Sequence, residues 1–498
     1  MDYVFIVDNR PLWAILISLF AAIIILFNDK RPNVRERVTL IAATGKVVIV
    51  FSMLPAVLTG HILETAPIDI VEGISLHFRA DALGILFAAL AAFLWVITSF
   101  YSIGYMRRIG GKHQTGFYAA FALCLSATMG IAFSANLSTF FIFYEMLMLS
   151  AYPLVVHKRH EDAIRAGRKY LAYALVSGQL FLMGIIWIYV LYDNTTFAAG
   201  GFMEGNTPIW VLRVIFTLLL CGTAVKSAIM PLHGWLPSAM VAPTPVSALL
   251  HAVAVVNAGV FAIIRIVGYV FGPELLSQIG AATVLAWLAA FTIIISSLIA
   301  LSHDNLKKRL AYSTIGQLSY MVLGAALLTP LGFLGGIFYM VAHSFMKITL
   351  FFCAGAIYAT NHLSNVSEMK GIGLKMPYTM AAFTVGALGI SGLPFIVGFL
   401  GKWYIALGAL QGGQWIFIAI LIGSSLLSIS YLMPIVYMAF FKSPAENCVD
   451  CQEAGLMMRV PLLLTAAFSL ILGIFPDFGA QFYSLAFMAA ENITGGGM

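Results

Sequence analysis

Several ionisable residues interrupt long apolar stretches of this 498-residue sequence. Glu145, in FFIFYEMLML, is the one carboxylate deep in such a stretch, and the basic residues in similar positions are Lys46, Arg213, Lys226, Arg265, Lys347 and Lys402. A charge at the centre of a bilayer costs at least ~2.5–3.5 kcal/mol, so a buried lysine needs water or a carboxylate beside it. A Glu/Lys pair that approaches and separates can exchange protons, because proximity favours the charged forms and burial favours the neutral ones. We therefore expect Glu145 to partner a buried lysine in a proton path; the alternative is a static ion pair that holds helices together.

Lys226 precedes a proline-rich interruption of its helix. The sequence from 218 to 265 predicts an apolar helix that breaks at Pro231, and again at Pro243 and Pro245, before a second apolar helix resumes, because proline cannot continue a helix interior. Non-helical backbone persists at membrane depth only where protein or water surrounds it. The segment is therefore predicted to be a broken helix that carries a buried lysine.

A second interrupted segment carries another lysine. In GALGISGLPFIVGFLGKWYI, Gly392 and Pro394 break the helix and Lys402 follows. Broken apolar segments in corresponding places of two halves are typical of inverted-repeat transporters. We expect the repeats to contain the fourth to eighth and the ninth to thirteenth membrane spans.

Histidines and small polar residues extend this set. His343 and Lys347 are four residues apart and so share one helix face, which favours a relay role over a histidine that is merely hydrogen-bonded. Both roles stay open for His251, and His233 in the break is explained at least as well by bonding to freed backbone groups. Three hydroxyl residues are candidates to hydrate the path, although such residues usually serve helix packing: Ser227, Ser313 and Thr314.

Other features carry weaker signals. Lys46 is expected to have a structural role, pointing to the interior or to a neighbouring subunit. Cys448 and Cys451 form a single CxxC. Because a structural zinc site needs four ligands, we interpret the cysteines as incidental or packing residues, with metal binding between subunits as the alternative. The sequence has no phosphate-binding glycine loop and no haem or iron–sulfur ligand run, so no cofactor is expected in this chain.

The composition fixes the class of protein. Hydrophobic residues make up 61% of the sequence and charged residues only 10%, against roughly 25% charge in soluble domains. This excludes a soluble protein and gives no indication of a nucleic-acid partner. Apolar runs long enough to cross a bilayer predict about fourteen transmembrane helices in an all-α polytopic protein, at 12–27, 38–60, 82–105, 117–135, 137–156, 169–192, 209–230, 244–271, 279–301, 310–329, 332–360, 378–408, 415–441 and 456–475.

The basic residues predict the orientation. Most of the 27 Lys and Arg residues fall in loops that follow odd-numbered spans. The positive-inside rule then places those loops in the cytoplasm and both termini on the outer side. Arg213 and Arg265 lie near span ends, where we expect their side chains to reach the interface. No cleavable signal peptide is evident, so the first span is expected to stay.

Specific motifs give a resemblance to a known family. KSAIMPLHGWLPSAMVAPTPVSALLHA and LKKRLAYSTIGQLSYM, supported by AHSFMKITLFFCAGAIY, resemble the proton-pumping antiporter-like subunits shared by respiratory complex I, membrane-bound hydrogenases and Mrp-type cation/proton antiporters. The likeness covers essentially the whole chain. The length of the chain and the stretches GKWYIALGAL and LMPIVYMAFF are most similar to the D-type subunit of Mrp antiporters and its counterparts in membrane-bound hydrogenases.

The resemblance implies a mechanism. Glu145 matches the acidic residue of the fifth helix, Lys226 its lysine partner in the broken seventh, Lys347 a lysine of the eleventh and Lys402 the exit-side lysine of the broken twelfth. His251 and His343 match histidines that line the same polar axis. Asn257 departs from the pattern, because it stands where many relatives have a lysine. Since asparagine cannot store a proton, the resemblance implies that His251 or Lys347 takes over the central step, or that the path is weakened.

The resemblance also implies organisation and function. We expect N-terminal helices at 1–110, a first repeat at 111–271, a second repeat at 272–441, and a loop, a last helix and a tail at 442–498. The chain is expected to move protons, in one form against Na⁺ or K⁺, with other membrane subunits in a prokaryotic inner membrane. The alternatives are a proton-pumping subunit of a redox-driven complex (hydrogenase, formate or quinone oxidoreductase) and a structural subunit with an attenuated path. No catalytic chemistry is expected in the chain itself.

Overall fold

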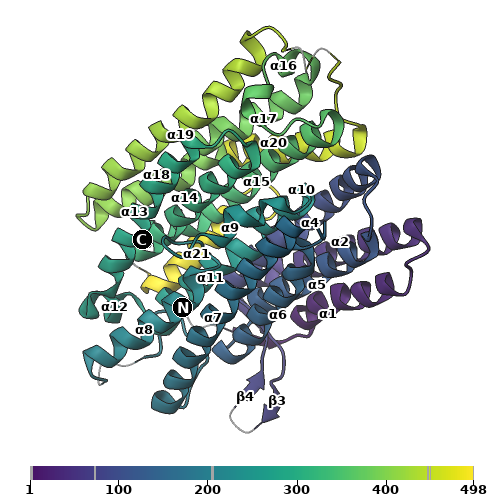
Figure 1. Cartoon of the computed structure of the whole chain (residues 1–498). Helices are drawn as coiled ribbons and strands as arrows, with labels where there is room; N and C mark the ends of the chain where they lie inside the picture. Colours follow the sequence, from purple (N-terminus) through teal and green to yellow (C-terminus); the bar gives the residue numbers. More distant parts are fainter. Residues whose placement is uncertain (1–3, 72–73, 204–206, 446–447, 449, 497–498) are drawn as a thin grey trace.

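A computed structural model describes residues 4–71, 74–203, 207–445, 448 and 450–496, apart from the side chains of Leu250 and His251. The predicted site residue His251 is therefore described only by its backbone. Figure 1 shows a bundle of helices that run in roughly the same direction or its reverse, with the first helices along one edge and the last long helices along the opposite edge. Segments from both ends of the chain thus enclose the middle helices.

The described residues up to Tyr192 form seven helices, of which the fourth lies in the interior of the bundle. Asp81 caps the fourth of them by accepting a 2.7 Å hydrogen bond from Gly84 N, and the helix ends at Gly110, whose φ of 67° suits glycine. The helices are α1 (Arg10–Leu26), α2 (Pro32–Phe51), α3 (Leu54–Leu58), α4 (Ala82–Ile109), α5 (Gln114–Phe133), α6 (Leu137–Val155) and α7 (Glu161–Tyr192).

Five short strands lie in the connections at one end of this group. β1 (Val4–Val7) pairs parallel with β2 (His61–Glu64), which pairs antiparallel with β5 (Arg79–Ala80). β3 (Ile68–Val71) and β4 (Ile74–Leu76) form a hairpin that projects from the bundle (Figure 1). We call the end of the bundle that carries this hairpin the hairpin end. The opposite end, where the α4–α5 and α6–α7 loops lie, is called the basic end. The sequence does not predict the strands, because hydropathy detects only segments long enough to cross a bilayer.

The middle of the chain contains the first predicted break. α8 (Ile209–Ala224) stops before Pro231, and short turns α9 (Trp235–Ser238) and η1 (Ala239–Val241) follow. The predicted continuous helix 244–271 is wrong in detail, because Val253 and Ala254 separate two helices and a π-helix ends the second one. These elements are α10 (Thr244–Ala252), α11 (Val255–Arg265), η2 (Ile266–Phe271) and α12 (Pro273–Ile279).

The rest of the chain is arranged around α15, whose most apolar stretch is entirely buried. α15 packs against α4 and α10 from the first half as well as against α14, α17, α18, α20 and α21. The second predicted break falls at Gly392, between α17 and α18. The bounds are α13 (Ala281–Ser302), α14 (Leu306–Ala326), α15 (Pro330–Asn361), η3 (Val366–Glu368), α16 (Ile372–Lys375), α17 (Pro377–Ser391), α18 (Val397–Gln411), α19 (Ile416–Phe441), α20 (Leu456–Ile474) and α21 (Phe482–Thr494).

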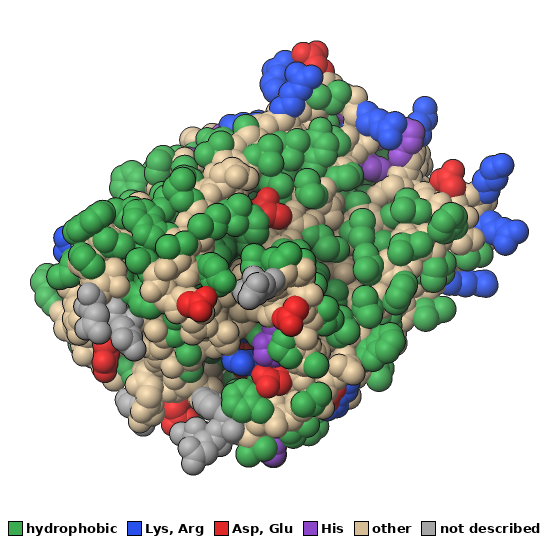
Figure 2. All heavy atoms as spheres, turned by 90° about the horizontal axis from the view of Figure 1, so that it is seen from below, with side chains coloured by type: hydrophobic (Ala, Val, Ile, Leu, Met, Phe, Trp, Pro, Cys, Tyr) green, Lys and Arg blue, Asp and Glu red, His purple; other side chains and the backbone are tan. Residues whose placement is uncertain are grey.

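The helices make this an integral, multi-pass membrane protein. Within the described residues, nine helices are long and apolar enough to cross a membrane, or ten if one bent pair counts as a single span. Figure 2 shows hydrophobic side chains over much of the surface, with Lys and Arg side chains gathered along its upper and right-hand edges. Fewer helices than the predicted fourteen meet this test. α1 and α8 have only 17 and 16 residues, the break at Gly392 divides another span, and α14 is long enough but too polar. The predicted span 244–271 contributes only the bent pair.

Candidate functional site

Lys226 lies at the first break and is 1% exposed. Its Nζ donates to the Tyr144 carbonyl oxygen at 2.5 Å and lies 3.0 Å from the centroid of the Tyr144 ring. Beside the break, Trp235 Nε1 donates to the Val225 carbonyl at 2.6 Å. The N–H of Ile229 turns to the Ala224 carbonyl, so the Val225 carbonyl is bound by Ala228 N and by this side chain, which keeps its oxygen satisfied at the break. The hydroxyl of Ser227, a predicted support residue, bonds its own turn, with the Thr223 carbonyl at 3.2 Å and the Ala224 carbonyl at 3.3 Å.

Glu145 lies near Lys226 but does not form an ion pair with it in the described part of the chain, because the amine binds the preceding residue instead. The half-buried carboxylate faces α7 at Gly178, where an added Cβ would lie 2.7 Å from Oε1. Only glycine leaves room for the carboxylate at this point. The structure therefore holds the predicted pair apart.

Asn257 joins the two halves of the chain at the break between α10 and α11. Its Nδ2 donates to the Ala252 carbonyl and to Ser344 Oγ, both at 2.9 Å. Ser344 Oγ donates to the same carbonyl at 2.7 Å. Ala252 ends α10, so two side chains satisfy its freed oxygen. Asn257 thus has a structural role at this break.

The next residues of the axis lie on α15. His343 precedes Ser344 and is buried, and Lys347 lies one turn further on. Lys347 Nζ donates to Ser313 Oγ at 2.5 Å and to the Leu310 carbonyl at 3.3 Å. Ser313 Oγ in turn lies 2.8 Å from Tyr431 Oη. The polar contacts therefore continue from α15 through α14 to α19.

Two other predicted support residues lie off this line. Thr314 bonds its own helix, at the Leu310 carbonyl. His233 is half-buried beside the first break, with its ring 6.2 Å from that of Tyr312. Among the hydrogen bonds of the described residues, none joins either side chain to a lysine of the predicted axis.

Lys402 lies at the second break in an arrangement that resembles the first. Its Nζ donates to the Ile390 carbonyl at 2.6 Å and to Ser425 Oγ at 3.2 Å, and it lies 4.8 Å from the Tyr320 ring centroid. Ile390 lies just before Gly392, whose φ is 86°. A lysine thus binds a carbonyl oxygen where the helix ends.

Lys46 and the cysteines stand apart from this line. Lys46 points to the interior of its own chain, where Nζ donates to Ser18 Oγ at 2.6 Å and to the Leu125 carbonyl at 3.1 Å. The Sγ atoms of Cys448 and Cys451 are 2.7 Å apart. Among the described residues, no group of three or more His, Cys, Asp or Glu side chains could hold a metal ion.

The structure adds a buried ion pair that sequence reasoning missed. The expectation that Arg265 reaches the interface is wrong, because its side chain is 2% exposed and both of its terminal nitrogens contact Asp81, at 2.5 and 2.7 Å. The rings of Phe197, Phe261 and Tyr269 surround the guanidinium. The signals were present, because Asp81 stands directly before an apolar run and a buried arginine needs a carboxylate.

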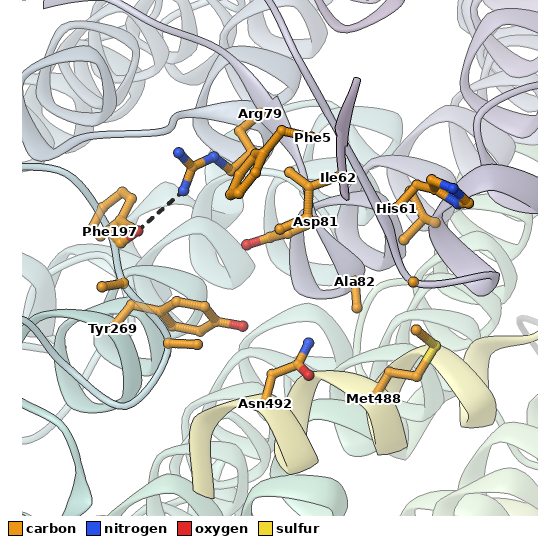
Figure 3. Close-up of a pocket in the computed structure, with 14 residues that line it drawn as sticks. Phe5, His61, Ile62, Arg79, Asp81, Ala82, Phe197, Tyr269, Met488 and Asn492 are labelled. Carbon is orange, nitrogen blue, oxygen red and sulfur yellow. Dashed lines mark hydrogen bonds between the residues drawn. The ribbon is translucent and has the colours of Figure 1, made fainter. Parts of the chain in front are cut away.

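A pocket of about 270 Å³ opens beside this pair at the hairpin end (Figure 3). Asp81 and Tyr269 line it together with Asn492 of α21, so the last helix closes a pocket built by the first strands. Arg79 also lines it and donates to the Phe197 carbonyl at 3.2 Å. The ends of the described chain therefore meet here.

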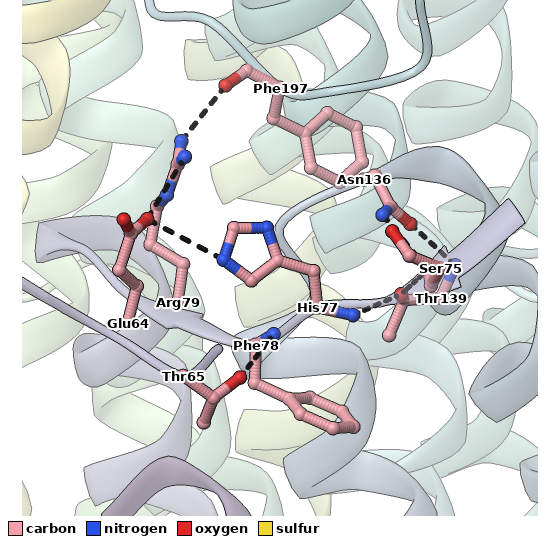
Figure 4. Close-up of polar contacts among 9 residues, drawn as sticks. All are labelled: Glu64, Thr65, Ser75, His77, Phe78, Arg79, Asn136, Thr139 and Phe197. Atoms are coloured by element: carbon pink, nitrogen blue, oxygen red, sulfur yellow. Dashed lines mark hydrogen bonds and ion pairs between the residues drawn. The ribbon is translucent and has the colours of Figure 1, made fainter. Parts of the chain in front are cut away.

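A second polar cluster lies next to it (Figure 4). Glu64 Oε2 lies 3.3 Å from Arg79 Nη2 and 3.5 Å from His77 Nε2. The main-chain nitrogen of His77 donates to Thr139 Oγ1 at 3.0 Å, which ties the loop to α6. Burial lowers the pKa of His77, although Glu64 attracts the proton. The histidine is therefore neutral at neutral pH.

Comparisons with known proteins agree with this architecture. Residues 134–428 match the family model described as NADH:quinone oxidoreductase/Mrp antiporter, TM. The chain is 31% identical over 405 residues to the N-type subunit of the NADH-quinone oxidoreductase of Desulforudis audaxviator, covering 78% of this chain and 80% of that one. It is 26% identical over 477 residues to the D-type subunit of the Na⁺/H⁺ antiporter of Bacillus subtilis, covering 94% of each.

A solved structure shows the same fold. A chain of the Mrp complex from Dietzia sp. superimposes with a TM-score of 0.87 at 21% identity, covering 98% of this chain and 97% of that one. The match to the family model spans more than half of the sequence and includes both helix breaks. This chain is therefore a member of the NADH:quinone oxidoreductase/Mrp antiporter family of membrane subunits.

Proposed function

We propose that this chain moves protons along a buried polar axis as an antiporter-like subunit of a larger membrane complex. One observation carries the proposal: at both helix breaks, a buried lysine binds neutral oxygen atoms instead of a carboxylate. Such an amine can release its proton without leaving an unpaired buried carboxylate behind. Ionisable groups at membrane depth ordinarily belong to ion or proton paths.

The proposed path runs from Glu145 and Lys226 through the centre of the chain to Lys402. Asn257 and Ser344 supply hydrogen bonds between the halves but store no proton. The central storage step falls to groups on α10 and α15, which are His251, His343 and Lys347. His343 and Lys347 are four residues apart on α15 and so share one helix face, which supports a relay between them.

Single substitutions test this path in the reconstituted complex. Lys226→Gln and Lys402→Gln, which retain N–H donors but cannot hold a proton, should each reduce proton uptake, followed with a pH-sensitive dye, to below a tenth of wild type. Lys46→Gln is the matched control, because Lys46 is also a buried amine held by a hydroxyl and a carbonyl. It should assemble and transport normally. Near-normal uptake in both path variants would exclude the proposal.

The driving force has two candidates, each favoured by a relative. The B. subtilis relative is named as part of a Na⁺/H⁺ antiporter, which favours exchange against Na⁺ or K⁺. The D. audaxviator relative is named as part of an NADH-quinone oxidoreductase, which favours a redox-driven complex. Flavin or iron–sulfur absorbance in the intact purified complex would select the second. Much faster flux in Asn257→Lys would instead indicate that the native path is attenuated.

We also propose fourteen crossings with both termini on the outer side of a prokaryotic cytoplasmic membrane. The concentration of Lys and Arg in the basic-end loops supports this orientation. Inverted repeats at 111–271 and 272–441 would each contain one break, with 1–110 and 442–498 flanking them. Membrane-impermeant thiol labelling of single cysteines at positions 112 and 479, in a cysteine-free background, should reach only the second from outside.

A further inference from the structure

A pocket of about 400 Å³ lies at the basic end, between the end of α4, the loop from α6 to α7 and the start of α10. Its remaining walls are neutral, including Tyr105 and Tyr358, and none of its lining residues is an Asp or Glu. Six basic side chains line it: Lys112, His113, His157, Lys158, Arg159 and His160. This is a concentration of positive charge around a cavity.

Three helices begin at the same pocket. His113, His160 and Pro243 are the N-cap residues of α5, α7 and α10, and none of them offers a side-chain cap. The first N–H groups of a helix lack internal partners, and the helix dipole gives this end a partial positive charge. Together they form a common site for phosphate groups.

No nearby carboxylate offsets this charge within the pocket. Glu161, in the first turn of α7, is 88% exposed and pairs with Arg165 at 3.0 Å. The Lys158 amine instead lies 5.8 Å from the Tyr358 ring centroid. Burial, together with the nearby His113, Arg159 and Lys158, lowers the pKa of His157 to about 4. The site therefore disfavours a further proton and favours an anion.

We propose that this pocket binds a phosphate-bearing anion, from a lipid headgroup or from solution. Lys158 and Arg159 would donate to its oxygens from the α6–α7 loop, and the first main-chain N–H groups of α5 would donate from the facing side. Charge-assisted bonds from arginine and lysine are the strong contacts to phosphate. Basic pockets between helices on the cytoplasmic side are typical lipid headgroup sites.

The site would brace the helices that carry the polar axis. Thr244 begins α10, and its Oγ1 and main-chain N lie 3.3 and 3.4 Å from Tyr105 Oη on α4. On the same helix, Tyr101 Oη donates to the Phe352 carbonyl of α15 at 2.7 Å. A ligand held against Tyr105 would fix the start of α10 relative to α4 and α15. The binding itself does not depend on proton transport.

Calorimetric titration of the purified complex in phosphatidylcholine mixed micelles tests the proposal, with two probes: dioleoylphosphatidylglycerol and inorganic phosphate. Lys158→Gln/Arg159→Gln should weaken binding about 30-fold, at ~1 kcal/mol for each basic residue near the surface. The matched control is Lys30→Gln/Arg31→Gln, which removes two exposed charges from the same end of the bundle. It should stay within about threefold of wild type.

The two probes distinguish the source of the phosphate. Saturable binding of phosphatidylglycerol alone identifies a lipid headgroup, whereas binding or competition by inorganic phosphate identifies a soluble anion. Either result supports the site if only the pocket variant loses it. The proposal is wrong if neither probe saturates, or if both double variants weaken binding equally. Melting temperatures without probe show that each variant is folded.

Discussion

The Asp81–Arg265 pair allows one stability prediction to be worked out in detail. Asp81→Asn removes the negative charge with almost no change in volume. The asparagine oxygen can still accept the 2.7 Å hydrogen bond from Gly84 N, since Asn and Asp cap helices about equally well. The substitution therefore isolates the charge interaction with Arg265, which is buried among aromatic rings.

Asp81→Asn should lower the free energy of unfolding by a large amount, because the charge of Arg265 stays buried without its partner. Removing one member of a buried ion pair costs ~3–5 kcal/mol, and Asp81→Ala should cost ~1 kcal/mol more, because the cap is also lost. Denaturant titration of the purified complex at pH 7 measures both. In a double-mutant cycle with Arg265→Met, the double variant should be clearly more stable than the sum of the single effects predicts.

The control is an exposed pair of the same chemistry. Glu161 and Arg165 are four residues apart and 88% and 73% exposed, so Glu161→Gln should cost at most ~0.5 kcal/mol. If Asp81→Asn is equally mild, or if the cycle is additive, the pair does not stabilise the fold as argued. Arg265 would then have another partner or reach water.

Two further predictions concern the path and the basic end. Gly178→Ala should displace the Glu145 carboxylate, since the new Cβ would lie 2.7 Å from Oε1, and so slow proton uptake; Gly116→Ala, where an added Cβ meets nothing within 4 Å, should not. The free energy of unfolding should fall as the pH drops from about 6.5 toward 4. In this range His157 binds a proton in the unfolded chain but not in the folded one, where its pKa is lowered to about 4. Melting temperatures of wild type and His157→Asn should show a smaller pH dependence in the variant, and equal slopes would contradict this.

Local sequence predicts the features that depend on local chemistry. Proline removes a helical hydrogen bond and glycine allows a positive φ, so the breaks at Pro231 and Gly392 are predictable, each with its lysine. Such residues favour a break without forcing one, because Pro153, Pro434 and Pro461 lie inside helices. Ser313 is one of the residues predicted to line the path, and it binds Lys347. The next residue, Thr314, is predicted together with Ser313, but its hydroxyl bonds the Leu310 carbonyl of its own helix. Neighbouring residues of a helix point about 100° apart, so the two side chains have different surroundings.

Features that depend on distant segments escape such reasoning. The break after Ala252 contains neither proline nor glycine, and it is satisfied partly by Ser344, 92 residues along the chain. Arg265 finds Asp81 184 residues away, so spacing alone suggests an interfacial position. The sequence predicts a pair of Glu145 with Lys226 because both are ionisable residues in apolar segments. In the structure, however, the Lys226 amine donates to the Tyr144 carbonyl.

For Lys402, the structural role at the helix break and the proposed role in transport involve the same amine. Its amine binds the Ile390 carbonyl at the break, so Lys402→Met would leave a buried acceptor unsatisfied, at ~1–3 kcal/mol, and lost transport would be ambiguous. Lys402→Gln retains N–H donors for that carbonyl but cannot hold a proton. If Lys402 carries protons, the glutamine variant should keep most of its stability in denaturant titration while proton uptake is lost. If the glutamine variant takes up protons normally and only the methionine variant loses stability and uptake, then Lys402 serves only to bind the free carbonyl at the break.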